Sequence, residues 1–584
     1  MLDFRNTNTL WCSVLVETLA CLGLKRVVIC PGSRSTPLTI AFTQHPLIEA
    51  ISVLDERSAS FFALGLAKRD GLPVALVCSS GTAGANFYPA IIEAQETGIP
   101  LIIFTADRPP ELRYCHAGQA VDQVKFYGNY PNWSLELALP VADIDLLNYL
   151  RQNIIQGWSK SLYPVKGVVH FNCPFREPLA PVSEPATKTL QTQIGESFFA
   201  HLSLMTAQNL ALNQPSNLLS NLNLPTKGII IGGLAQIPAD AAKSYCQKIA
   251  TLSKKLNYPV LAEALSPLRN YQEINTQLIT NYDRILRFSK FQDELKPQAI
   301  IQIGELPTSK KLRQWLHQID IPRYIISTKP ENLDPTHGRT IHIRSSLDEL
   351  VRSIEPIKHQ KSHEATTYWQ LWQSLEQKVL TEITQSFQQQ DSITEAKIPW
   401  LVSVSLPSKT PVFFANSMTV RYAEFFWQSN NKHIVPYFNR GANGIDGTLS
   451  TALGIAHSSN RPTIMLTGDL ALLHDTNGFL LGQHLQGHLT IILVNNNGGG
   501  IFEILPISQH NPPFEEYFAT PQNISFQLLA RTYKVEYQVI HKWQELVDAI
   551  AILPKQGIRI LELKTDRYAD AEWLTQKFWQ PSKL

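Results

Sequence analysis

The strongest constraint on the fold is a repeated alternation of short, β-rich apolar runs with helical stretches. Near the N-terminus these runs are VVIC (27–30), SVL (52–54), VALVCSS (74–80), LIIFTAD (101–107) and VVHFN (168–172). Strands that alternate with helices form βαβ units, and therefore a parallel sheet. The stretch 174–185 (PFREPLAPVSEP) has four prolines and no periodicity, so we interpret it as an extended linker after the first domain.

The same alternation occurs twice more along the 584 residues. A second set of runs lies at 228–234, 259–265, 299–306, 323–328 and 340–344, before a polar stretch at 358–367. A third set lies at 412–417, 434–439, 463–469, 489–496 and 559–566. We therefore predict an α/β protein with three doubly wound parallel-sheet domains, spanning 1–180, 195–355 and 370–584. The three domains could be distant copies of one plan.

Composition excludes several classes of protein. With 44% hydrophobic and 17% charged residues, the chain can bury several cores and is not mainly disordered. Lys and Arg total 51 against 49 Asp and Glu, so the chain lacks the basic excess of a nucleic-acid binder. The seven cysteines form no CxxC pair, which argues against a disulfide framework and against a zinc site.

The N-terminal sequence favours a cytoplasmic protein. MLDFRNTNTLWCSVLVETLACLGL predicts an amphipathic helix that starts from an Asn/Thr cap, and it lacks the regions of a signal peptide. No apolar run approaches the 18 or so residues that a membrane span requires. We therefore expect a cytoplasmic location without a membrane span.

Two strand ends in the third domain carry the most informative motif. One strand ends at Gly468-Asp469, and the next ends in the run Asn495 to Gly499 (NNNGG). Both ends lie at the carboxyl edge of a parallel sheet, where a carboxylate, an amide oxygen and a backbone carbonyl suit Mg²⁺ with a diphosphate. Each motif alone could be an ordinary turn. Together they form the thiamine diphosphate signature, whereas no GxxxxGK or strand-following GxGxxG supports another nucleotide fold.

Thiamine chemistry also needs an acid that hydrogen-bonds the aminopyrimidine ring. Glu56 follows the strand SVLD, and Ala59, Phe61 and Phe62 predict an apolar setting for it. The alternative for Glu56 is a solvated helix cap. Gly81, in SGTAGAN (80–86), could let the backbone approach the ring, or could simply form a tight turn.

The motifs, taken in order, carry a family resemblance. They are PGSRSTPL (31–38), DER (55–57), SGTAGANFYPA (80–90), ADRPPEL (106–112), NRGANGIDG (439–447), GDL (468–470) and NNNGGGIF (495–502). The chain resembles the 2-succinyl-5-enolpyruvyl-6-hydroxy-3-cyclohexene-1-carboxylate (SEPHCHC) synthases, thiamine diphosphate enzymes of menaquinone and phylloquinone biosynthesis. The resemblance covers both end domains and is weaker in the middle one.

This resemblance implies a transferase activity. The family decarboxylates 2-oxoglutarate and adds the succinyl carbanion to isochorismate in a Stetter-like step, which gives SEPHCHC and CO₂. It implies thiamine diphosphate with Mg²⁺ or Mn²⁺ as cofactors. It also implies a homodimer or homotetramer with active sites at the subunit interface.

The resemblance further assigns the cofactor site. Glu56 is the activating acid, and Asp469, Asn496 and the Gly498 carbonyl hold the metal. Contacts to the cofactor are implied for Gly81, Gly468, Leu470, Ile445 as the wedge below it, and Ile501, Phe502 and Leu505 as an apolar wall. Without the resemblance, Ile501, Phe502 and Leu505 would be interpreted as core residues, and Ile445 would be too.

Both substrates are dianionic, so cations must be concentrated where they bind. The resemblance assigns Ser417 and Arg421 to the distal carboxylate of 2-oxoglutarate. It assigns Arg34, Arg108, Gln119 and Arg440 to isochorismate, with Lys310 and Lys311 as a basic pair from the middle domain. Ser33, in the same turn as Arg34, is a further candidate site residue. The alternative for each arginine is a surface salt bridge. Two positions depart from the family pattern: Gly118 replaces a common Asn, and Lys311 replaces a frequent Arg.

Two rival interpretations stay open at this point. The first is another thiamine enzyme, similar to acetolactate synthase or to a 2-oxo-acid decarboxylase. The second is a non-catalytic binding protein that keeps the fold, which the presence of both Glu56 and Asp469 disfavours. The sequence leaves open which quinone the pathway serves and whether dimers pair into tetramers.

Overall fold

The computed structural model describes residues 2–194, 198–200, 202, 224–354 and 362–580. Its strands form three six-stranded sheets in which neighbouring strands are parallel, so the predicted α/β class with three doubly wound domains is confirmed. The described residues divide into two compact units. The first contains those within 1–213, 439–458 and 474–486, and the second contains the remainder. The predicted domain limits stay predictions, and those at 195 and 355 lie outside the described residues.

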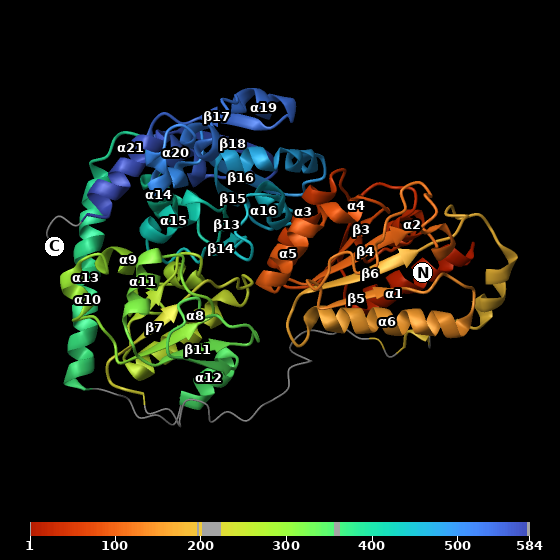
Figure 1. Ribbon diagram of the computed structural model, residues 1–584, viewed down its shortest axis with the longest axis horizontal. Helices are drawn as coiled ribbons and strands as arrows, with labels where there is room; N and C mark the ends of the chain where they lie inside the picture. Colours follow the sequence, from red (N-terminus) through yellow and green to blue (C-terminus); the bar gives the residue numbers. More distant parts are fainter. Residues whose placement is uncertain (1, 195–197, 201, 203–223, 355–361, 581–584) are drawn as a thin grey trace. The chain divides into compact units, whose positions relative to one another are not determined.

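The first unit is built on a sheet with the strand order β2-β1-β3-β4-β6-β5 (Figure 1). Its strands are β1 (Arg26–Ile29), β2 (Glu49–Ser52), β3 (Val74–Cys78), β4 (Leu101–Asp107), β5 (Trp133–Glu136) and β6 (Val168–Pro174). Its helices are α1 (Thr7–Leu22), α2 (Thr36–Gln44), α3 (Glu56–Asp70), α4 (Ala83–Asn86), α5 (Tyr88–Thr97) and α6 (Ile144–Leu162). Helices α1 and α6 pack together over one face of the sheet, and α3 covers the other (Figure 1).

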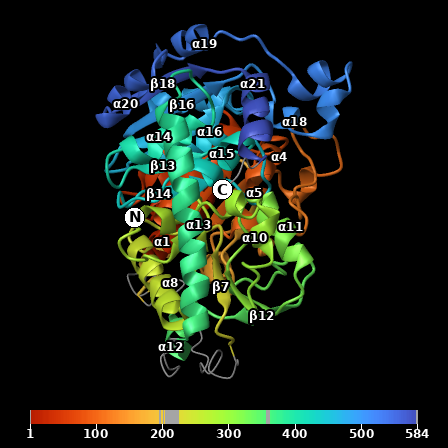
Figure 2. The same cartoon turned by 90° about the vertical axis from the view of Figure 1, so that its left-hand side faces the viewer.

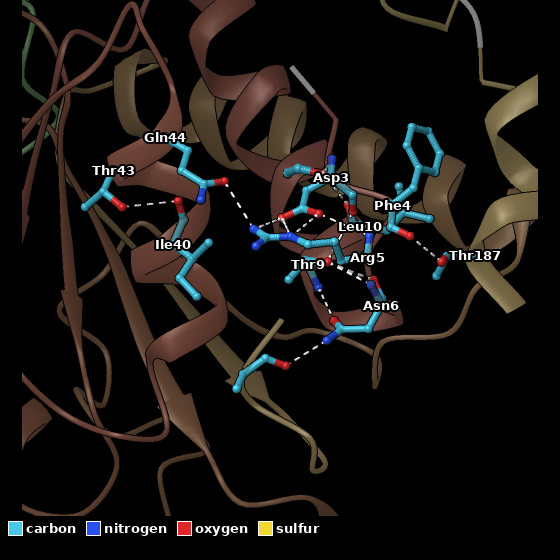
Figure 3. Close-up of polar contacts among 12 residues, drawn as sticks. Asp3, Phe4, Arg5, Asn6, Thr9, Leu10, Ile40, Thr43, Gln44 and Thr187 are labelled. Carbon is cyan, nitrogen blue, oxygen red and sulfur yellow. Dashed lines mark hydrogen bonds and ion pairs between the residues drawn. The ribbon is translucent and has the colours of Figure 1, made fainter. Parts of the chain in front are cut away.

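Helix α1 has the predicted Asn/Thr cap. The Asn6 side chain accepts a hydrogen bond from the Thr9 N–H (2.9 Å), and Thr9 Oγ1 accepts one from the Asn6 N–H (3.1 Å). Figure 3 shows this cap beside the Arg5–Asp3 ion pair. The predicted amphipathic character is wrong, because twelve of the sixteen helix residues are buried. Contacts with α2, α6 and the short helix Pro185–Thr192 cover the faces that a surface helix would expose.

Two glycines bring helix α16 (Thr448–Ala456) against α3 within the first unit. A Cβ on Gly65 would lie 2.1 Å from the carbonyl oxygen of Thr451, and a Cβ on Gly454 would lie 2.1 Å from that of Phe62. A side chain at either position would force the helices apart. This close approach anchors the segment 439–458 to the helix that begins at Glu56.

The second unit contains the other two sheets. The middle sheet has the order β12-β11-β10-β7-β8-β9. Its strands are β7 (Gly228–Gly232), β8 (Val260–Ala262), β9 (Leu278–Ile279), β10 (Ala299–Ile303), β11 (Arg323–Ser327) and β12 (Thr340–Arg344). Its helices are α8 (Ala242–Leu256), α9 (Tyr282–Ile285), α10 (Ser289–Gln292), α11 (Lys310–Gln318) and α12 (Leu347–Ile354).

The third sheet has the order β14-β13-β15-β16-β18-β17. Its strands are β13 (Pro411–Phe414), β14 (Val435–Phe438), β15 (Thr463–Gly468), β16 (His488–Asn495), β17 (Glu536–Val539) and β18 (Gly557–Lys564). The helices of this part are α14 (Lys397–Ser405), α15 (Met418–Phe426), α17 (Asp469–His474), α18 (Gly500–Glu503), α19 (Phe526–Thr532), α20 (Trp543–Ala551) and α21 (Arg567–Glu572).

Helix α13 (His363–Gln388) runs along the second unit (Figure 2). Its buried face, which includes Trp372 and Phe387, belongs to a cluster with Ile229 of the middle sheet and Met418 of α15. This cluster joins the middle and third sheets into one compact unit. Residues 363–367 of the predicted polar stretch open this helix, whereas 358–361 lie outside the described residues. No helix among the described residues is long and apolar enough to cross a membrane.

The sheets agree with the predicted strands except at their edges. Every predicted run contributes a strand, although β2 occupies 49–52 where 52–54 was expected. Each sheet also has one unpredicted strand (β5, β9 or β17), and each of these lies at a sheet edge. The first and third sheets share a strand order, whereas the middle sheet differs, so the three domains are not copies of one plan.

Candidate functional site

The strand order of the first sheet reverses at β1, and in such folds ligands bind at the carboxyl ends of the strands beside that reversal. The turn after β1 carries Arg34, and the turn after β3 carries Gly81. The turns lie close together because Gly32 has no side chain: a Cβ there would lie 2.2 Å from the Cβ of Ser79. Predicted residues from two separate strands are therefore brought side by side.

Arg34 is only 8% exposed. Its Nη1 donates to the Phe175 carbonyl (3.0 Å), and its Nη2 lies 3.3 Å from Oε1 of Glu177. Its Nε is buried and has no hydrogen-bond acceptor among the described residues. Burial, and then the positive charge of Arg108, lower the pKa of Arg34. A buried guanidinium with an unused donor and a cationic neighbour favours an anionic ligand.

Arg108 and Gln119 both contact Ser80. Arg108 Nη1 donates to Ser80 Oγ (3.1 Å), and Gln119 Nε2 donates to the Ser80 carbonyl (3.2 Å). Arg108 Nη2 also donates to the carbonyl of Gly118 (2.8 Å). Gly118, which replaces the Asn common in the family, thus contacts Arg108 through its backbone carbonyl. A Cβ at this position would meet no atom within 4 Å. Ser33, in the neighbouring turn, is exposed.

Gln123 is a residue of this site that the sequence did not reveal. It is 1% exposed, its Oε1 accepts the Gly81 N–H (2.9 Å), and its Nε2 donates to Asn172 Oδ1 (2.9 Å). Gln123 thereby fixes the turn after β3 to the interior of the sheet. A polar residue in an irregular segment gives no periodic signal, so only the folded contacts identify it.

Glu56 is the first residue of α3 and is half-buried. Asp55 caps the helix by accepting the Ser58 N–H (2.9 Å). Burial raises the pKa of the Cys78 thiol, and the negative charge of Glu56 contributes to that shift. Helix α3, which begins at Glu56, packs against β3, and its cap is made by Asp55. Ala59, Phe61 and Phe62 are buried as expected.

The segment with Arg440 and Ile445 is held against the helices of the first unit. Buried Glu93 of α5 accepts the N–H groups of Gly441 (3.1 Å) and Ala442 (2.8 Å), directly after Arg440. Gly447, with φ +63°, packs so closely on α3 that a Cβ would lie 1.9 Å from Phe61 Cγ. Ile445 precedes this contact and is half-buried, so it is anchored beside the helix that carries Glu56.

In the second unit, Ser417 follows β13 and precedes α15. Its backbone has φ 70° and ψ −131°, a rare conformation for serine that is typical of functional sites. Arg421 lies one helical turn later, and its Nη1 donates to the Ser417 carbonyl (2.6 Å). Lys310 is the exposed first residue of α11, and Lys311 beside it is half-buried.

Asp469 and the NNNGG run meet at the carboxyl edge of the third sheet. Asp469 is 5% exposed, and its Oδ1 and Oδ2 accept the N–H groups of Leu470 (2.8 Å) and Gly498 (2.8 Å). Burial raises the pKa of Asp469 to about 6, although the two N–H groups oppose that shift. Gly498 has φ +146°, and a Cβ there would lie 2.5 Å from the Ala519 carbonyl oxygen.

Asn496 presents an unused oxygen at the same place. Its Nδ2 donates to Glu395 Oε1 (2.5 Å), while its Oδ1 is buried and has no hydrogen-bond donor among the described residues. Beyond Gly468 there is open space, because a Cβ there would meet no atom within 4 Å. A carboxylate, an orphaned amide oxygen and a backbone carbonyl fit a divalent cation with oxygen ligands. Glu395 was not predicted from the sequence.

The three residues of the predicted apolar wall differ in burial. Ile501 in α18 packs against the buried cluster that contains Met418. Phe502 is half-buried and meets Phe518 edge-on, with ring centroids 5.7 Å apart. Leu505 is 38% exposed, so it does not behave as a core residue in the described part of the chain.

Family models for thiamine pyrophosphate enzymes match most of the chain. The model described as the N-terminal TPP binding domain matches residues 12–126. The model described as the middle domain of thiamine pyrophosphate matches 191–414, and the C-terminal TPP binding domain matches 416–562. The thiamine diphosphate signature at Asp469 and Asn496 falls within the last of these.

Curated relatives are similar over almost the full length. A SEPHCHC synthase of Gloeothece citriformis is 56% identical over 98% of each chain. Others are those of Microcystis aeruginosa (55%, over 99% of this chain and 100% of the relative) and Rippkaea orientalis (54%, over 100% and 98%). The chain belongs to the SEPHCHC synthase family. The family predicted from the motifs is confirmed, and members of this family are thiamine diphosphate enzymes.

Solved structures share the SEPHCHC synthase fold at low sequence identity. A benzoylformate decarboxylase from Polynucleobacter necessarius has a TM-score of 0.68 and 14% identity, covering 97% of this chain and 99% of that one. A 4-hydroxybenzoylformate decarboxylase from Rhodococcus jostii also has a TM-score of 0.68, with 16% identity over 95% and 99%. These likenesses concern the fold alone.

Proposed function

We propose that this chain decarboxylates 2-oxoglutarate and joins the succinyl unit to isochorismate, with thiamine diphosphate and Mg²⁺ or Mn²⁺ as cofactors. When bound, thiamine diphosphate supplies an electron sink for the loss of CO₂ from a 2-oxo acid. Membership of the SEPHCHC synthase family supports this reaction. The observation that carries the substrate assignment is that Arg34 and Arg108 belong to adjoining turns of the first unit, since Gly32 packs against Ser79 and Arg108 donates to Ser80.

In this proposal, the residues of the second unit hold the metal and the diphosphate. Asp469, Asn496 Oδ1 and the Gly498 carbonyl are the metal ligands, and Gly468 and Leu470 border the diphosphate. Glu56 and Gly81 contact the aminopyrimidine ring, and Ile445 supports the cofactor from below. Ile501, Phe502 and Leu505 exclude water from the reacting carbon.

The substrates are held by separate sets of cations. Ser417 and Arg421 bind the distal carboxylate of 2-oxoglutarate. The isochorismate carboxylates are bound by residues that end or follow strands: Ser33, Arg34, Arg108, Gln119 and Arg440, with Lys310 from the middle sheet. The proximity of Arg34 and Arg108 supports this division, because two carboxylates on one small ring require two nearby cations.

The division of the arginines predicts losses in different half-reactions. Removing one charge-assisted contact costs about 1.5–3 kcal/mol, or roughly 10- to 150-fold. Arg421→Ala should slow CO₂ release from 2-oxoglutarate alone, measured by stopped-flow in a single turnover. Arg34→Ala should leave that step near its original rate, and should raise KM for isochorismate or lower the rate of the joining step.

Arg461→Ala is a matched control, because Arg461 is exposed and its Nη1 donates to the Ser408 carbonyl (3.1 Å). It should change neither half-reaction. Equal losses for Arg421→Ala and Arg34→Ala in CO₂ release would contradict two separate carboxylate sites. A general 2-oxo-acid decarboxylase would then be the better interpretation.

We also propose a cytoplasmic homodimer or homotetramer whose active sites combine residues of two subunits. All seven cysteines are free thiols, as is typical of a reducing compartment. Glu56 belongs to the first compact unit and Asp469 to the second. The segment with Gln119 exposes apolar side chains, including Tyr114 at 92%, which suits a subunit contact.

Mixing two inactive variants tests the shared site. If one site takes Glu56 from one subunit and Asp469 from the other, a mixed dimer of Glu56→Gln and Asp469→Asn has one intact site. Random exchange of subunits should then restore about a quarter of the original activity. Each variant alone, taken through the same unfolding and refolding, is the control. No recovery after mixed dimers have been demonstrated by mass spectrometry would place both residues of a site in one chain.

A further inference from the structure

The metal ligands proposed above include an amide, and an amide can face a cation with either its oxygen or its NH₂ group. Only the oxygen can act as a ligand. Asn496 is half-buried at the end of β16, and its Oδ1 is the atom that lacks a donor. Something must therefore select the orientation in which the NH₂ group points away from the metal position.

Glu395 occupies the position that selects this orientation. Its Oε1 accepts a hydrogen bond from Asn496 Nδ2 (2.5 Å), and the residue is only 6% exposed. A carboxyl oxygen at this position accepts a hydrogen bond from the NH₂ group, and it would repel the amide oxygen. In the structure Oε1 is the acceptor, and a carboxylate has no donor with which it could hold the amide oxygen instead.

Glu395 is itself held in place by neighbouring elements of the second unit. Its backbone N–H donates to Asp570 Oδ1 (3.1 Å) in α21, and Thr565 Oγ1 lies 3.5 Å from its Oε1. Helix α21 also holds the other side of the NNNGG run, because Arg567 Nη1 donates to the Asn497 carbonyl (2.8 Å). The carboxyl group of Glu395 is thus a fixed reference for Asn496.

We propose that Glu395 is a positioning residue that orients the Asn496 amide so that Oδ1 faces the metal. This inference rests on the proposed metal site and deepens it, since Glu395 touches neither metal nor substrate. Outer-shell partners of metal ligands typically change affinity by about 10- to 100-fold, and we expect a loss of that size when Glu395 loses its acceptor.

The first experiment measures Mn²⁺ affinity by electron paramagnetic resonance, in the full chain with thiamine diphosphate present. Glu395→Met keeps the approximate size but removes the acceptor, so it should weaken Mn²⁺ binding by about 10- to 100-fold. Glu395→Gln can present its amide oxygen to Asn496 and should bind Mn²⁺ nearly as well as the original chain. Asp570→Asn contacts the Glu395 backbone but not Asn496, so it serves as the control for destabilisation.

Unfolding temperatures separate positioning from a structural role. If Glu395→Met and Asp570→Asn lose Mn²⁺ affinity alike, in proportion to their loss of stability, the positioning role is wrong. It is also wrong if Glu395→Met binds Mn²⁺ normally while Asp469→Asn does not. If Asp469→Asn itself binds Mn²⁺ normally, the proposed metal site fails, and this failure is distinguishable from that of Glu395.

A second experiment measures Mn²⁺ affinity in other variants and does not depend on the folding of Glu395→Met. An aspartate at position 496 has oxygens on both sides and needs no orientation, but it would face the Glu395 carboxyl. Asn496→Asp should therefore bind Mn²⁺ less tightly than Asn496→Asp combined with Glu395→Gln, whereas Glu395→Gln alone should bring no gain. Equal affinities for Asn496→Asp with and without Glu395→Gln would overturn the inference.

Discussion

Replacing Glu56 by Gln is expected to preserve thiamine diphosphate binding while slowing proton exchange at the thiazolium C2 by about 10²- to 10⁴-fold. Glutamine keeps the size of the side chain at the start of α3, but it cannot serve as the acid beside the aminopyrimidine. The metal and diphosphate contacts are proposed to come from the second unit, so binding should change little. Quenched-flow deuterium exchange followed by NMR measures the rate, and calorimetry measures the affinity.

The neighbouring residue provides a matched control for Glu56. Asp55→Asn changes a carboxylate in the same turn, yet an asparagine can still cap α3 through the Ser58 N–H. Exchange in Asp55→Asn should stay close to that of the original chain. If Glu56→Gln exchanged its C2 proton at the original rate, Glu56 would have no part in activation.

Replacing Asp469 by Asn is expected to weaken the binding of Mg²⁺ and of thiamine diphosphate together. Asp469 is the one charged side chain among the proposed metal ligands, and Asn would also turn an NH₂ group toward a backbone N–H. Because outer-shell partners already change metal affinity by about 10- to 100-fold, we expect a loss of at least about 100-fold for this ligand. Titration with Mn²⁺ at fixed thiamine diphosphate measures it.

Asp475→Asn is the matched control. Asp475 is also buried, but its Oδ2 accepts a hydrogen bond from the Ser450 N–H (2.7 Å) and it is not a proposed metal ligand. It should leave metal affinity unchanged and alter only stability. Burial raises the pKa of Asp475 from 3.8 to about 6, so its ionisation lowers stability as the pH rises between these values. The asparagine should remove that decline.

Unchanged metal dependence in Asp469→Asn would mean that the strand-end motif has been misinterpreted.

Sequence periodicity predicted the central strands because both of their faces are buried and apolar. The strands that it missed, β5, β9 and β17, lie at sheet edges. β5 and β17 are partly exposed, and β9 has only two residues, so none of the three gives a long apolar run. The burial of α1 was missed for a related reason, since its covering depends on elements distant in sequence.

The residues of the candidate site also fall into those that the sequence could predict and those that it could not. Asp469 and Asn496 could be predicted because a strand end followed by a fixed residue type is a local signal. Gln123 and Glu395 could not, because their hydrogen bonds to Gly81 and Asn496 join segments far apart in the chain. The assignment of 439–458 to the first compact unit was equally invisible, since it depends on the glycine contact between α16 and α3.

The strand order shared by the first and third sheets gives the chain an internal pseudo-repeat. In both sheets the first strand lies between the second and third, so the turns after the first and third strands border equivalent crevices. In one repeat these turns carry Arg34 and Gly81, and in the other they carry Ser417 and Asp469. In the proposed function, the crevice of the first sheet would serve isochorismate and the aminopyrimidine ring, whereas that of the third sheet would serve the metal and the distal carboxylate of 2-oxoglutarate. One strand order would thus frame two different binding tasks.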